Sequence, residues 1–139
     1  MPTSAGQQYQ SINTQTGVVD ADPHRLIQML FNGALDKISI AKGCIQRNDV
    51  AGKGEAISKA IGIVGGLRDS VRPVGDDSLA DNLSSLYEFV TDRLTYANVQ
   101  ADVDALDESA KILKELQAGW DAIRADAVKN LNQRESATA

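Results

Sequence analysis

The sequence DPHRLIQMLFNGALDKISIAKGCIQR, residues 22–47, predicts a long helix that the rest of the chain must cover. Asp22 can cap this helix, and Pro23 suits its first position because proline has no N–H to leave unbonded. Two neighbouring rows of apolar residues follow at i+4 spacing and form a wide stripe, so more than one partner helix is expected to pack on it. One row is Leu26, Leu30, Ala34, Ile38, Ala41 and Ile45, and the other is Ile27, Phe31 and Leu35.

Three more amphipathic segments follow, and each has a signal for its start or its end. Asp49 can cap the second helix, and Pro73 marks its end because it disfavours helical geometry in the residue before it. Asp77 or Ser78 can cap the third helix, and Asp102 can cap the fourth. Four amphipathic helices with short joints predict an all-α fold, an antiparallel up-down-up-down four-helix bundle. The predicted helices span residues 23–47, 50–71, 78–100 and 103–125.

Two polar segments flank the predicted bundle of residues 22–125. Residues 1–20 are rich in Gln, Ser and Thr, so we expect a flexible N-terminal arm whose apolar points include Tyr9 and Ile12. Residues 126–139 are polar and mixed in charge, so we expect a C-terminal tail that frays.

Composition limits the classes of protein to consider. The chain of 139 residues suits one domain, and its 42% hydrophobic and 24% charged residues are ordinary for a soluble globular protein. No apolar run approaches the ~18 residues of a membrane span, and the first residues do not resemble a signal peptide. The single cysteine, Cys44, excludes an intramolecular disulfide and fits a cytoplasmic location. A net charge of −5 with scattered basic residues argues against a nucleic-acid partner.

Residues suited to catalysis or metal binding are sparse. His24 is the only histidine, whereas a di-iron carboxylate bundle needs two Glu-x-x-His pairs and a histidine zinc site needs several imidazoles. No spacing places His24 beside a serine and a carboxylate as a triad requires. Gly52-Lys53-Gly54 lacks the remaining positions of a phosphate-binding loop. We therefore expect neither an enzyme nor a metal or other cofactor.

The helices carry more apolar side chains than one buried stripe on each would use. This surplus could be covered by the N-terminal arm, or it could form a groove for a partner helix with anchors at i, i+3, i+4 and i+7. A third possibility is a self-associating helical adaptor or scaffold protein that uses the spare face to dimerise. The surplus residues are Ile27, Phe31, Leu35, Ile63, Leu67, Phe89, Tyr96 and Val99.

Five glycines weaken the second predicted helix, because each interior glycine costs about 0.8–1 kcal/mol relative to alanine. They suit either a surface that adapts to a partner or helices that approach closely. They are Gly52, Gly54, Gly62, Gly65 and Gly66.

Several motifs run in order through the chain. After YQSINTQTG at 9–17 come DPHRLIQMLFNGAL at 22–35, KGEAISKAIGIVGGLRDSV at 53–71, NLSSLYEFV at 82–90, RLTYAN at 93–98 and LKELQAGWDAI at 113–123. Together they resemble the FliS family of flagellin export chaperones. Phe31 stands where that family usually has tyrosine, and the lead-in TGVVDADP is longer than the family's.

The resemblance implies a cytoplasmic, non-enzymatic chaperone that binds the disordered C-terminal region of flagellin. Such a protein prevents premature polymerisation and aids delivery to the flagellar type III export apparatus, with an export-gate component as a second implied partner. Tyr9 and Ile12 are then candidates for a lid over the flagellin-binding surface. The candidates for the groove itself are Ile57, Ile61, Val64, Leu67, Tyr87 and Trp120.

Overall fold

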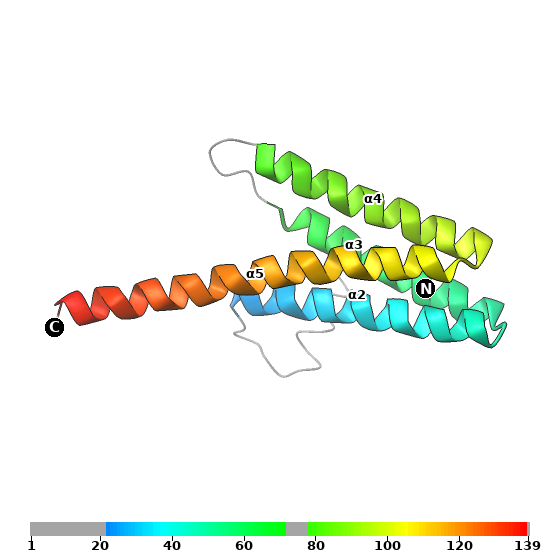
Figure 1. The fold of residues 1–139 in the computed structure, drawn as a ribbon, viewed down its shortest axis with the longest axis horizontal. Helices are drawn as coiled ribbons and strands as arrows, with labels where there is room; N and C mark the ends of the chain where they lie inside the picture. The colour runs from blue at the N-terminus through cyan, green and yellow to red at the C-terminus, as the bar shows by residue number, and fades with distance from the viewer. Residues whose placement is uncertain (1–21, 72–77, 139) are drawn as a thin grey trace.

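Four helices make up the described part of the chain. The computed structural model describes residues 22–71 and 78–138, with side chains described as far as residue 123. Helix α2 packs against α3 and α5, and α4 packs against the same two helices (Figure 1). The predicted all-α four-helix bundle is therefore confirmed, whereas the predicted arm at 1–20 lies outside the described residues. The helices are α2 (Pro23–Gln46), α3 (Val50–Asp69), α4 (Ser78–Gln100) and α5 (Val103–Thr138).

Three aspartates cap helices where the sequence predicts them. The Asp22 side chain accepts a hydrogen bond from the Arg25 N–H at 2.9 Å, and Asp49 accepts one from the Gly52 N–H at 2.9 Å. Asp102 accepts from two successive N–H groups in the first turn of α5, at 2.9 and 3.3 Å. Each cap satisfies a backbone donor that the helix itself leaves unbonded, typically worth about 1 kcal/mol.

Helix α5 is longer than predicted. The sequence predicts an end near Ala125 and a fraying tail at 126–139, but the helix continues to Thr138. No glycine or proline follows Gly119, and most of the remaining residues form helices well, so nothing stops propagation. The carboxyl end of α5 therefore extends past the start of α2 (Figure 1). The other helix ends lie within two residues of the predicted ones.

The core is aliphatic, and it includes the second apolar rows that the sequence analysis counted as surplus. Phe31 is 1% exposed, and Ile63 and Leu67 are buried as well. The prediction of spare apolar surface is therefore wrong for Ile27, Phe31, Ile63 and Leu67, whereas Leu35 is only partly buried. Helix α2 has a neighbour on two flanks, α3 and α5, so both of its rows are needed to fill the space between them.

The glycines of α3 have different surroundings. A Cβ added at Gly52 would lie 2.9 Å from the Cys44 Sγ and would collide with the Asp49 carboxylate that caps α3. A Cβ added at Gly65 would meet nothing within 4 Å. Close helix approach therefore does not explain Gly65.

This contrast predicts opposite effects of two glycine-to-alanine substitutions. Gly65→Ala should raise the free energy of unfolding by about 0.8–1 kcal/mol, because alanine is the better helix former and has room. Gly52→Ala should lower it by about 1 kcal/mol or more, because the added carbon displaces the cap. Urea unfolding followed by far-UV circular dichroism measures both changes. An equal response of the two variants would contradict this account.

Ala101, in the joint between α4 and α5, has a φ of 50°. This left-handed conformation costs a non-glycine residue about 1–2 kcal/mol, whereas glycine adopts it freely. Ala101→Gly should therefore stabilise the protein by about 1 kcal/mol, measured by urea unfolding. Ala118→Gly is the control, because Ala118 lies in the interior of α5, where the same substitution should destabilise by about 1 kcal/mol.

Candidate functional site

Among the side chains that the structure describes, α4 exposes more large apolar ones than any other helix. Phe89 is 44% exposed, and Tyr96 and Val99 are exposed as well, so the surplus that the sequence predicts on this helix is confirmed. Leu79 and Leu86 are 67% and 39% exposed, although they continue, at helical spacing, the apolar row whose later members Val90 and Leu94 are buried. The amino half of α4 is thus less covered than its carboxyl half, where Val90, Leu94 and Ala97 are fully buried.

One flank of α4 faces α5. Arg93 Nε donates to Glu108 Oε2 across these two helices at 3.1 Å. Phe89 lies one turn before Arg93, and Leu86 lies two turns before it, so both follow the same flank. On α5, Ile112 follows Glu108 by one turn in the same way. Leu86 and Phe89 are therefore directed toward the side of α5 that carries Ile112.

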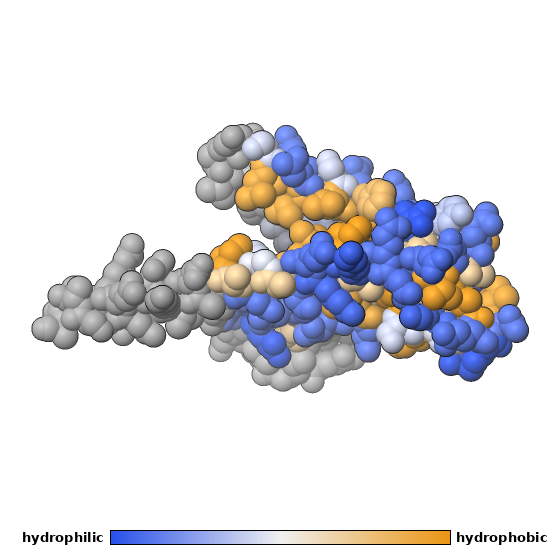
Figure 2. Space-filling model, in the orientation of Figure 1, coloured by the Kyte–Doolittle hydropathy of each residue, from blue (hydrophilic) through white to orange (hydrophobic). Residues whose placement is uncertain are grey.

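A hollow with hydrophobic walls lies between the amino half of α4 and α5 (Figure 2). Ile123 on α5 is 60% exposed, and a Cβ added at Gly119 would meet nothing within 4 Å, so this stretch of α5 is also uncovered. Exposed apolar side chains gathered on neighbouring helices are typical of surfaces that bind another chain. We call this hollow the α4–α5 cleft. We assign to it the exposed Leu79, Leu86 and Phe89 of α4 and Ile123 of α5, together with the partly buried Leu83, Ile112 and Leu116.

The opposite flank of α5 is attached to α2 by polar contacts. They are spread along both helices and run between side chains on or near the surface. Each surface contact is worth little alone, but together they fix the position of α5 relative to α2. The distances are 2.6 Å for Gln28 Nε2 to Asp121 Oδ1, 2.7 Å for Gln117 Nε2 to Asn32 Oδ1, and 2.9 Å for Lys42 Nζ to Asp107 Oδ1.

The structure places most of the predicted groove residues inside the bundle. Ile57, Val64, Leu67 and Tyr87 are buried. Burial raises the pKa of the Tyr87 phenol to about 12, because the apolar surroundings disfavour the charged phenolate. In this arrangement the four side chains fill the core beneath the surface, and a direct contact with a client stays a prediction.

The remaining predicted residues lie elsewhere. Ile61 and Trp120 are half-buried against the core, and the proposed lid residues, Tyr9 and Ile12, lie outside the described residues. Sequence reasoning missed Leu79 and Leu86 as surface residues. They continue the regular apolar stripe of α4, and no residue type along that stripe indicates where α5 stops covering it.

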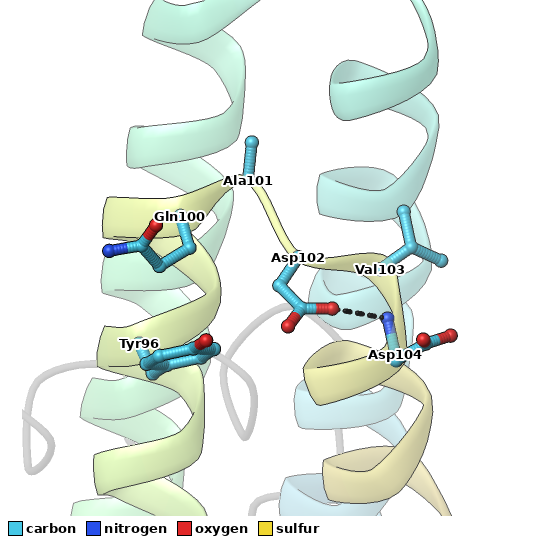
Figure 3. Close-up of a pocket in the computed structure, with 6 residues that line it drawn as sticks. All are labelled: Tyr96, Gln100, Ala101, Asp102, Val103 and Asp104. Carbon is cyan, nitrogen blue, oxygen red and sulfur yellow. Dashed lines mark hydrogen bonds between the residues drawn. The ribbon is translucent and has the colours of Figure 1, made fainter.

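A second, shallow hollow of about 490 Å³ lies where α4 joins α5 (Figure 3). Two of its residues already have structural roles: Asp102 caps α5, and the guanidinium carbon of Arg93 lies 4.8 Å from the centre of the Tyr96 ring. This hollow has no arrangement of nucleophile and base. It is lined by Tyr96, Gln100, Ala101, Asp102, Val103 and Asp104.

Charged side chains elsewhere form ordinary surface pairs. Glu55 accepts from Lys59 Nζ at 2.9 Å, and this hydrogen bond and the positive charge lower the pKa of the Glu55 carboxyl. Within residues 22–71 and 78–123, no three His, Cys, Asp or Glu side chains gather as they would around a metal ion. Among the described helices, none combines the length and the apolar composition needed to cross a membrane.

Comparison with known proteins identifies the family. The family model described as flagellar protein FliS matches residues 5–127. The chain is 44% identical to the flagellar secretion chaperone FliSB of Pseudomonas aeruginosa over 119 residues, which cover 86% of this chain and 94% of that protein. It is 36% identical to the flagellar secretion chaperone FliS of Salmonella typhimurium over 125 residues, which cover 88% and 93%. The chain therefore belongs to the FliS family of flagellar secretion chaperones.

Proposed function

We propose that this protein binds the disordered C-terminal region of flagellin in the cytoplasm, prevents its premature polymerisation and aids its delivery to the flagellar type III export apparatus. The observation that carries the proposal is the α4–α5 cleft, an uncovered apolar surface on a member of a chaperone family. A chaperone that holds a client needs such a surface, whereas a self-contained bundle does not.

The shape and chemistry of the cleft favour an amphipathic helical segment as its occupant. Leu79, Leu83 and Leu86 follow one another at about one turn on α4, with Phe89 beside the last of them. A client helix with apolar residues at i, i+3, i+4 and i+7 can place its anchors along this row. A client that is disordered when free also spends free energy on ordering as it binds, so the complex can be specific and still come apart for export.

The chaperone acts by binding alone in this proposal, without an enzymatic step. Support comes from the cleft itself, where the side chains are apolar and suited to binding another apolar surface. A component of the export gate is proposed as a second partner that receives the complex.

The test is a calorimetric titration of the purified protein with the last 40–50 residues of the cognate flagellin, about the length expected of a wrapped disordered client. A peptide of the same composition in scrambled order is the control. Saturable binding of the native peptide alone supports the proposal. No binding of the native peptide would end it.

The alternative is a self-associating adaptor or scaffold, and the exposed face of α4 is the observation in its favour. Static light scattering of the free protein over a wide concentration range separates the two functions. A stable dimer that leaves no peptide-binding site favours the scaffold, whereas a monomer leaves the cleft free for a client.

A further inference from the structure

His24 and Trp120 form a reciprocal contact between the first turn of α2 and the middle of α5. The two rings are stacked, with centroids 4.8 Å apart and planes inclined by 10°. His24 Nε2 lies 2.8 Å from the Trp120 carbonyl oxygen, and Trp120 Nε1 donates to the His24 carbonyl oxygen at 3.0 Å. Because a carbonyl oxygen only accepts, Nε2 must carry the proton of the first bond. We call this arrangement the His24–Trp120 clamp.

The clamp holds α5 at the point where support from the other side is missing. Ile123 and Gly119 are uncovered on the flank that faces α4, and the amino half of α4 is exposed as well. The polar contacts with α2 near this point, Gln28–Asp121 and Gln117–Asn32, lie at the surface, where water competes for them. The His24–Trp120 clamp is the half-buried member of this group.

We propose that the His24–Trp120 clamp positions the stretch of α5 from Leu116 to Ile123 as one wall of the α4–α5 cleft. His24 is then a positioning residue: it lies on α2, on the far side of α5 from α4, and acts on the client through Trp120. The proposal deepens the proposed function, and the effect of His24 on flagellin affinity rests on that function. Its effect on α5 is independent of any client.

Two variants separate the parts of the clamp. His24→Ala removes the ring and the donor, whereas His24→Gln keeps a donor of similar reach without the aromatic ring. Ser39→Ala, an exposed substitution elsewhere on α2, is the matched control. Circular dichroism and the unfolding midpoint identify any variant that fails to fold. The clamp also has its own signal, because Trp120 is the only tryptophan, so its fluorescence reports on His24 directly.

The first readout is hydrogen exchange of the amides at 116–123 in the free protein. We expect exchange to become about three- to tenfold faster in His24→Ala, the equivalent of losing one hydrogen bond, and partial recovery in His24→Gln. Exchange in α3 should stay unchanged. A shift in Trp120 fluorescence without faster exchange at 116–123 would overturn the proposal.

The second readout is affinity for the flagellin peptide, measured with the same variants. We expect His24→Ala to bind about three- to tenfold more weakly than the parent, and Ser39→Ala to bind equally well. If the parent binds and His24→Ala binds as tightly, the clamp does not position the cleft and the proposal fails while the chaperone function stands. If the parent does not bind, the proposed function fails and hydrogen exchange alone decides whether the clamp positions α5.

Discussion

Replacing Phe31 with alanine is expected to lower the free energy of unfolding by about 3–5 kcal/mol, which is the usual cost of removing a buried phenylalanine ring. Phe31 is 1% exposed and lies in the second apolar row of α2, among the side chains that fill the bundle. The substitution removes buried apolar area and leaves a cavity that rigid helices fill only in part. A domain of this size has a total stability of roughly 5–15 kcal/mol, so the variant should approach the limit of folding.

Urea unfolding followed by circular dichroism measures this effect. At a typical dependence of roughly 2 kcal/mol per molar urea, the midpoint should fall by about 2 M. Phe31→Leu is the control, because it keeps most of the volume and should cost much less. A loss below about 1 kcal/mol in Phe31→Ala would mean that the second row of α2 is not part of the core.

Phe89, the second phenylalanine, should show the opposite pattern: its replacement should weaken client binding and leave the free energy of unfolding almost unchanged. Phe89→Ala is expected to weaken binding of the flagellin peptide by about tenfold or more, because an aromatic side chain in an apolar cleft is a typical binding hot spot. Its effect on stability should stay near 0.5 kcal/mol, because the side chain is 44% exposed in the free protein. Calorimetric titration and urea unfolding of the same preparation give both numbers.

Because Phe31 and Phe89 are the only two phenylalanines, the same substitution tests the core and the cleft separately. Leu86→Ala should behave as Phe89→Ala does, since Leu86 lies on the same flank of α4. Lys59→Ala, on the exposed surface of α3, should change neither quantity by much. Unchanged affinity in both Phe89→Ala and Leu86→Ala would place the client elsewhere on the molecule.

Local signals in the sequence predict the helices well. Asp22, Asp49 and Asp102 each cap the helix that their position indicates, because a cap depends only on a side chain and the backbone a few residues on. The period of the apolar residues likewise predicts four helices, and a helix needs only its own sequence to show an apolar stripe. These features do not depend on how the helices meet.

The position of the exposed apolar surface depends on tertiary packing, and the sequence does not encode it locally. Phe31 and Phe89 both lie beside a main stripe, yet Phe31 is buried and Phe89 is exposed, because α3 and α5 cover α2 at Phe31, whereas the same two helices leave the amino half of α4 partly open. Leu79 and Leu86 continue the stripe of α4, so periodicity alone places them in the core. The His24–Trp120 contact joins residues that are far apart in the chain, and the identity of neither residue indicates which residue it contacts.

The length of α5 affects how the mass of this protein must be measured. The helix has 36 residues and so spans about 54 Å, whereas a compact chain of this size has a radius of gyration of about 14 Å and a diameter of only about 36 Å. A helix that projects from one end gives the protein a larger hydrodynamic radius than a compact protein of the same mass. A monomer should therefore elute early from a sizing column and imitate a dimer, so only scattering or sedimentation equilibrium, which report mass without reference to shape, can establish how many chains associate.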